Sequence, residues 1–148
     1  MEAQRDFREL LESFNAHRVE YVIVGGYALA FHGVPRFTGD LDLYVRPTKD
    51  NAQRILGALA EFGFGQVGLS PSDFEEPGQV IQFGVAPVRI DLVTSIEGVS
   101  WEQVEHAKVV GMYGDLPAYY IGRAEFIANK KACARQKDLA DLEALGEG

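Results

Sequence analysis

The chain has 148 residues, 47% of them apolar and 24% charged, which is ordinary for a soluble globular protein and enough for one domain, residues 1–148, with its own core. The formal net charge of −8 argues against nucleic-acid binding driven by the charge of the whole molecule. We expect a cytoplasmic protein, because no apolar run could cross a membrane, the charged N-terminus does not resemble a signal peptide, and the single cysteine allows no internal disulfide.

Hydrophobic periodicity predicts the first elements along the chain. Residues 4–17 carry one apolar stripe at helical spacing and are predicted to form an amphipathic helix. Residues 20–25 are almost wholly apolar, as is typical of a central strand covered on both faces. A short apolar helix is expected at 27–32, and Thr48 is a plausible N-cap for a helix over 49–62.

The middle of the chain predicts a polar loop followed by a hairpin. Residues 64–67 are expected to form a short edge strand, and the two prolines of residues 68–78 indicate a loop that could cover a site as a mobile segment. Residues 80–83 and 88–93 are predicted to pair as a hairpin.

The last third contains a helix, a second hairpin and a helical end. Ser100 and Gln103 have the spacing of a capping box, which predicts a short helix opening at Trp101. Residues 108–112 and 116–121 are predicted to form a hairpin, and residues 123–145 are predicted to be helical and part of the same domain. The order of elements therefore predicts an α/β (α+β) fold with a mixed sheet.

Two glycines separate the first predicted strand from the helix that follows it. Gly25 and Gly26 allow a tight turn and a close approach of another group, and the start of a helix favours phosphate. A glycine pair after a strand is also common in plain turns, so this feature alone indicates no function.

Three aspartates point to a metal site. Side chains alternate along a strand, so Asp40 and Asp42 share a face, with Cα atoms roughly 6–7 Å apart. Such carboxylates repel each other unless a cation lies between them, and Mg²⁺ prefers oxygen ligands. A solvated strand face paired with Arg36 is the alternative. Asp91 lies in another apolar strand and, if the two strands are neighbours, completes the carboxylate set of a two-metal site.

Together these motifs resemble the nucleotidyltransferases of the DNA polymerase β superfamily. In that family a Gly-Gly pair opens a short helix, Asp-x-Asp follows on a strand, and a single Asp lies on a later strand. The sequence is most similar to small stand-alone members of the abortive-infection and toxin–antitoxin type, which share the pattern Arg-x-Thr-x-Asp-Leu-Asp seen here from Arg36 to Asp42. The resemblance implies a minimal nucleotidyltransferase fold, a mixed twisted sheet with helices packed mainly on one face.

The resemblance also implies roles for individual residues. Asp40, Asp42 and Asp91 would be the catalytic residues and would hold two Mg²⁺ ions, or Mn²⁺ in their place. The nucleotide would be bound by a larger set: Gly25, Gly26, Tyr27, Arg36, Thr38, Lys130 and Lys137. For Arg36 the alternative is a plain ion pair with an aspartate, and for Lys130 and Lys137 it is a solvated basic face.

The implied reaction is transfer of a nucleoside monophosphate from an NTP (ATP, GTP or CTP) to an acceptor hydroxyl, with release of pyrophosphate. The acceptor could be a protein, a tRNA or a small molecule such as an aminoglycoside. Many relatives have Ser or Thr where this chain has Tyr27. The alternative is a weakly active or inactive antitoxin-like module that binds a toxin or antitoxin protein; Tyr27 and the small size favour it, whereas the three aspartates oppose it. A phosphatase that uses Asp-x-Asp fits less well, because it needs no Gly-Gly helix.

Overall fold

The computed structural model of the protein describes residues 4–35, 39–63, 68–85 and 88–147. The predicted edge strand at 64–67 and the predicted nucleotide ligands Arg36 and Thr38 lie outside these residues. Within the described residues, none of the helices combines the length and apolar character that a membrane crossing requires.

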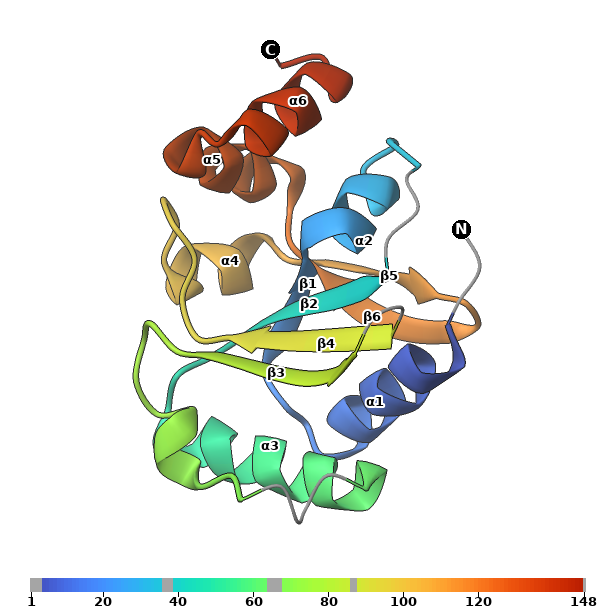
Figure 1. Ribbon diagram of the computed structural model, residues 1–148, viewed down its shortest axis with the longest axis vertical. Coiled ribbons are helices and arrows are strands. Elements are labelled where there is room, and N and C mark those ends of the chain that lie inside the picture. The colour runs from blue at the N-terminus through green and yellow to red at the C-terminus, as the bar shows by residue number, and fades with distance from the viewer. Residues whose placement is uncertain (1–3, 36–38, 64–67, 86–87, 148) are drawn as a thin grey trace.

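Over the described residues the chain forms six α-helices, one short 3₁₀ helix and six strands (Figure 1). The helices are α1 (Arg5–Ala16), α2 (Gly25–Phe31), α3 (Lys49–Phe62), η1 (Pro71–Asp73), α4 (Trp101–Ala107), α5 (Arg123–Cys133) and α6 (Gln136–Ala144). The strands are β1 (Tyr21–Val24), β2 (Asp40–Val45), β3 (Val80–Val85), β4 (Val88–Val93), β5 (Val109–Tyr113) and β6 (Leu116–Tyr120). The predicted α+β class with a mixed sheet is confirmed.

The strands form one mixed sheet in the order β3-β4-β2-β1-β6-β5. β2 runs parallel to β4 and antiparallel to β1, while β1 runs parallel to β6. The two predicted hairpins are confirmed as the antiparallel pairs β3–β4 and β5–β6, which form the two edges of the sheet. The strands β2 and β4, which carry the three aspartates, are therefore neighbours.

Helices α1 and α3 cover one face of the sheet, whereas α2, α4 and α5 lie on the other side (Figure 1). The side chains of β2 alternate between these two faces. Leu41 and Leu43 belong to the larger core under α1 and α3. Tyr44 belongs to a smaller core with α4 and α5, where its ring meets the ring of Trp101 edge to face. Asp42 shares its face of the strand with Tyr44, and thus lies on the less completely covered side of the sheet.

Helices α3 and α4 begin where their predicted N-cap residues lie. The Thr48 hydroxyl accepts a hydrogen bond from the Asn51 N–H (3.2 Å) and caps α3. Ser100 and Gln103 form the predicted capping box at the start of α4. Each cap satisfies backbone N–H groups that have no acceptor inside the helix.

The C-terminal helical stretch is interrupted at Ala134. This residue has φ 53°, a left-handed conformation that is unfavourable for a residue with a Cβ, and it separates α5 from α6. The interruption turns α6 back along α5, with which it makes close contact. The basic residues on either side of Ala134 therefore do not share the face of one continuous helix.

The polar loop at 68–78 does not cover the face of the sheet that carries Asp42, so the prediction of a mobile segment over a site there is wrong. Its 3₁₀ helix η1 contacts α3, and the fully buried Phe74 belongs to the core under α1 and α3. Phe74, together with the partly buried Leu69, thus attaches an otherwise polar loop to the core on the opposite face of the sheet.

Candidate active site

Two of the three predicted carboxylates lie directly side by side. In the parallel pair β2–β4, Asp42 is the register partner of Asp91, and Asp40 is the register partner of Arg89. The expectation that the strand carrying Asp91 lies beside the strand carrying Asp40 and Asp42 is confirmed. The Asp91 side chain is only 13% exposed, whereas that of Asp40 is 37% exposed.

Gly25 closes this part of the site from the side of β1. Val24 is the register partner of Asp42, so the first residue of α2 lies against the Asp42 carboxylate. A Cβ at Gly25 would overlap Asp42 Oδ2, and the φ of +69° is a conformation that favours glycine. The first glycine of the pair is therefore required both by the turn and by the approach of the carboxylate.

The environment of Asp42 opposes its ionisation. Burial, followed by the charge of Asp91, a hydrogen bond shared with Asp91, and the charge of Asp40, raises the pKa of Asp42 to about 7. The positive charge of Lys137 acts in the opposite direction and lowers it. Two adjacent carboxylates with insufficient positive charge between them produce this kind of shift.

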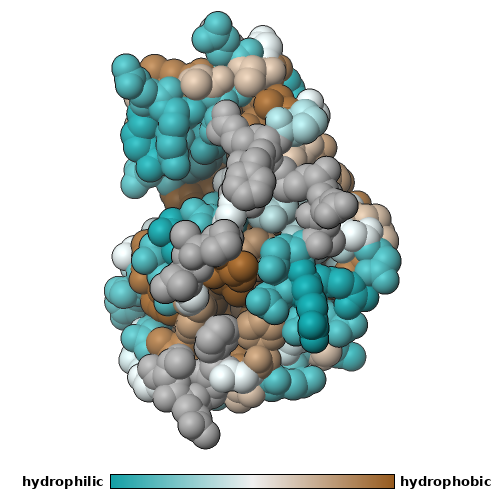
Figure 2. Space-filling view, turned by 45° about the vertical axis from the view of Figure 1, so that its right-hand side comes forward, coloured by the Kyte–Doolittle hydropathy of each residue, from teal (hydrophilic) through white to brown (hydrophobic). Residues whose placement is uncertain are grey.

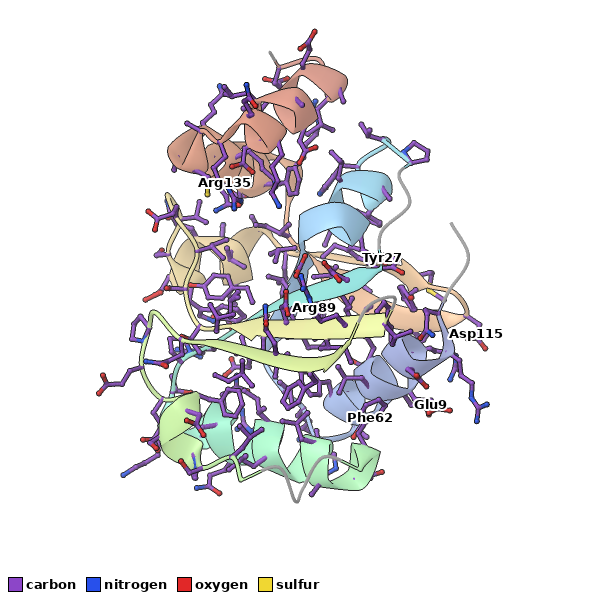
Figure 3. All side chains as sticks on the ribbon, in the orientation of Figure 1. Glu9, Tyr27, Phe62, Arg89, Asp115 and Arg135 are labelled. Carbon is purple, nitrogen blue, oxygen red and sulfur yellow. The ribbon has the colours of Figure 1, made fainter. Side chains whose placement is uncertain are left out.

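Arg89 lies among these carboxylates and was not recognised as a site residue from the sequence. Its Nη2 donates a hydrogen bond to Asp40 Oδ2 (2.9 Å), and its Nε lies 3.6 Å from Asp91 Oδ1. In Figure 3 its side chain extends from β4 toward α2. The signal was available in the sequence, because Arg89 precedes Asp91 by two residues and must share its face of the strand.

A pocket of about 520 Å³ opens beside Asp42 and Asp91. One wall consists of residues of β1, β2 and β4 and of residues 95–97 that follow β4, and the other is formed by α5, α6 and the turn between them. Figure 2 shows the C-terminal helices as a mostly hydrophilic lobe that stands apart from the body of the molecule. Three basic residues from this lobe, Lys130, Arg135 and Lys137, line the pocket opposite the carboxylates.

Lys130 is placed in the pocket wall, but its ammonium group is occupied by protein carboxylates. Nζ lies 3.1 Å from Asp138 Oδ1 and 3.3 Å from Asp141 Oδ2, and only 9% of the side chain is exposed. Burial opposes ionisation of Asp138, but hydrogen bonds from Arg135 and Lys130 outweigh it and lower the pKa of Asp138 to about 2. The predicted nucleotide ligand Lys130 thus joins α5 to α6 in this structure.

Lys137 is the basic residue of the pocket that agrees best with its predicted role. It is exposed at the start of α6, and its charge acts on Asp42 across the pocket. Arg135, which the sequence analysis did not select, is 60% exposed and donates hydrogen bonds to Asp138. Lys130 and Arg135 are paired with carboxylates of α6, so Lys137 supplies the positive charge that acts on Asp42.

The Tyr27 side chain points away from the pocket. Its ring is 7% exposed and packs edge to face on Phe7 and Tyr113, with centroids 5.9 and 5.4 Å away. The predicted part of Tyr27 in nucleotide binding is therefore limited to its backbone N–H. Gly26 and Tyr27 are the second and third residues of α2, where N–H groups have no acceptor within the helix.

The chemistry of Asp42 and Asp91 suits a divalent cation. Asp91 Oδ1 is buried without a hydrogen-bond partner among the described residues, and Asp42 is destabilised as an anion. A hard cation with oxygen ligands would satisfy both groups. As the described side chains are placed, no three acidic, imidazole or thiol groups converge on one point, since Asp40 is drawn to Arg89.

Two solved structures resemble this chain over nearly its whole length. One, TM1012 from Thermotoga maritima, is described as a nucleotidyltransferase; it has a TM-score of 0.62 and 14% identity, over 97% of this chain and 89% of that one. The other is the antibiotic-resistance factor ANT(2'')-Ia, with a TM-score of 0.60 and 12% identity, over 95% of this chain and 80% of that one. No family profile and no characterised protein sequence matches this chain. The structural likeness shows that the chain has the nucleotidyltransferase fold.

Proposed function

We propose that the protein is a Mg²⁺-dependent nucleotidyltransferase that moves a nucleoside monophosphate from an NTP to an acceptor hydroxyl and releases pyrophosphate. The observation that carries the proposal is the pairing of Asp42 with Asp91 at the edge of a pocket whose opposite wall is basic. The fold supports it, because this chain resembles both ANT(2'')-Ia and TM1012 in structure over nearly its whole length.

The carboxylates would hold the cation and the basic wall would hold the phosphates. Asp42 and Asp91 would be the ligands of a first Mg²⁺, and Asp40 would join Asp42 in holding a second. When bound, the cations would polarise the reacting phosphate and favour the deprotonated acceptor hydroxyl. The oxygen of Asp91 that does not hold the cation could accept the hydroxyl proton.

The protein would contribute mainly by positioning. Lys137 adds positive charge opposite Asp42, and the first residues of α2, whose N–H groups have no acceptor within the helix, begin beside the same carboxylate. Phosphoryl transfer depends largely on such placement and on neutralisation of charge, with little covalent chemistry by the protein. Tyr27 does not obstruct the phosphates, because its side chain belongs to the core.

A second function is favoured by the placement of Asp40. Its hydrogen bond to Arg89 leaves only Asp42 and Asp91 in direct apposition among the described carboxylates. A protein with this arrangement could bind a partner without catalysing transfer, as an antitoxin-like module would. Binding of Mg–NTP discriminates between the two functions.

The test is thermal unfolding in EDTA, in Mg²⁺, and in Mg²⁺ with each NTP. A ligand that binds only the folded state stabilises it by RT ln(1 + [L]/Kd), about 2.7 kcal/mol at a hundredfold excess over Kd. We expect one Mg–NTP to raise the unfolding midpoint of the native protein and to have no effect on Asp42→Asn. If no nucleotide raises the midpoint, the partner-binding function replaces the enzymatic one.

A further inference from the structure

Arg89 provides a positive charge inside the carboxylate group of the candidate site. Its guanidinium reaches Asp40 through Nη2 at 2.9 Å and approaches Asp91 through Nε at 3.6 Å. It comes from the same strand as Asp91, two residues earlier, and is the register partner of Asp40. These are two of the three carboxylates to which the proposed function assigns the cations.

The contact with Asp91 is incomplete. A separation of 3.6 Å is too long for an N–H···O hydrogen bond. Both atoms are buried, and neither Arg89 Nε nor Asp91 Oδ1 has a hydrogen-bond partner among the described residues. Buried charged groups that face each other without a hydrogen bond are poorly stabilised, so a better partner for the carboxylate can displace the guanidinium.

The Arg89 side chain is also partly exposed to solvent. The Arg89 side chain is 39% exposed, compared with 13% for Asp91, so it can turn toward solvent without opening the core. A divalent cation carries twice its charge and accepts several oxygen ligands at once. The same oxygens cannot serve the guanidinium and a metal ion equally well.

We propose that Arg89 is a built-in counter-ion that competes with divalent cations for Asp40 and Asp91. In the metal-free protein it limits the repulsion between the carboxylates, and it releases Asp91 when a cation binds. The inference rests on the proposed function, which makes these carboxylates the cation ligands. Its consequence is that Arg89 sets the concentration of divalent cation at which the site becomes loaded.

The test is a titration with Mn²⁺ in the absence of nucleotide. Binding is measured by calorimetry and by the loss of the electron paramagnetic resonance signal of free Mn²⁺. Because hydrogen bonds between charged groups are strong, removing the competitor in Arg89→Gln is expected to tighten Mn²⁺ binding roughly tenfold or more. The same variant is expected to unfold at a lower temperature in EDTA. Arg135→Gln is the matched control, because it removes a guanidinium that lines the same pocket but pairs with Asp138.

The outcomes separate this inference from the proposed function. If the native protein binds Mn²⁺ and Arg89→Gln binds it equally or more weakly, the competition is refuted while the metal site stands. If Arg135→Gln tightens binding as much as Arg89→Gln, the effect is one of overall charge and the inference is also refuted. If no variant binds Mn²⁺, the metal site and the inference fail together.

A second variant covers the case in which Arg89→Gln does not fold in EDTA. Arg89→Lys keeps the charge but cannot hydrogen-bond to two carboxylates as a guanidinium does. It is expected to bind Mn²⁺ more tightly than the native protein, and Mn²⁺ is expected to restore the circular dichroism of Arg89→Gln. A Lys variant with native or weaker affinity would count against the inference.

Discussion

Asp42 combines three conditions that rarely occur together in a carboxylate. It lies in a central strand, it is the register partner of another aspartate, and the backbone of Gly25 approaches its carboxylate closely. Each condition removes water or adds negative charge, and together they raise the pKa of the group to about 7. At neutral pH the ionisation of Asp42 therefore lowers the free energy of unfolding of the metal-free protein.

The cost of Asp42 predicts how the stability of the metal-free protein depends on pH. The pKa is about 7 in the folded protein and about 4 for an ordinary aspartate. Between these values the folded state holds a proton that the unfolded state has released, so the free energy of unfolding falls as pH rises. Thermal midpoints in EDTA should decrease from about pH 4 to about pH 7 in the native protein.

The Asp42→Asn variant provides the control for this prediction. It removes the titrating group, so its midpoint should change less with pH over the same window and should exceed the native midpoint at pH 7. Asp138 has the opposite shift, with a pKa of about 2, so its stabilising contribution is lost only as pH falls from about 4 toward 2 and is nearly constant across this window. An equally steep decrease in Asp42→Asn would show that another group is responsible.

At the scale of the element, the pair α5–α6 forms the basic wall of the pocket and is held together by charge. Lys130 from α5 lies between Asp138 and Asp141 from α6, and all three side chains are largely buried. The turn between the helices passes through Ala134 in a left-handed conformation. The buried ammonium group of Lys130 therefore links the two helices that form the wall.

Replacement of Lys130 by Met is expected to destabilise the protein strongly. The change removes the buried ammonium group from between Asp138 and Asp141, although Asp138 keeps its hydrogen bonds from Arg135. Removing one partner of a buried pair costs about 3–5 kcal/mol. The neighbouring Lys131 is exposed, so Lys131→Met should change the free energy of unfolding by less than about 0.5 kcal/mol. Urea unfolding of both variants provides the measurement; equal effects would contradict a buried role for Lys130.

At the scale of the whole molecule, the larger core lies on one side of the sheet, and the candidate site lies on the other side beside the smaller core. The larger core, under α1 and α3, contains the inward side chains of the two strands that carry the aspartates, including Leu43 and Leu92. The carboxylates project to the other side, where α5 and α6 stand away from the sheet and leave the pocket open. Packing and chemistry are thus assigned to alternate residues of the same strands.

This separation predicts that packing defects under α3 will not change ligand binding. Ile55 is fully buried in α3, and Ile55→Val removes one methyl group at a cost of about 0.5–1.5 kcal/mol. We expect this loss in urea unfolding, with the rise in thermal midpoint caused by Mg–NTP equal to that of the native protein. A loss of nucleotide affinity in Ile55→Val would show that the two faces are coupled.

The sequence was most informative where a pattern is local. The alternation of Leu and Asp in β2, the Thr48 cap and the Ser100–Gln103 capping box follow from short-range rules, and the structure confirms them. Phe74 was missed because one apolar residue in a polar loop has no periodicity that could reveal its anchor. The partners of Lys130 were missed because they lie 8 and 11 positions away across a turn that no glycine marks.

What the sequence determined by itself is most of the elements, the fold class, and the identity of the acidic residues that share one face. Propensity, alternation and capping act over a few residues, so they can be read without knowing the rest of the chain. Only the tertiary structure decided that Arg89 pairs with Asp40 on the neighbouring strand and that Tyr27 lies in the core. It also decided that Lys130 pairs with Asp138 and Asp141. Those outcomes depend on strand order, register and helix packing, which bring distant residues together and determine which charges are left for a ligand.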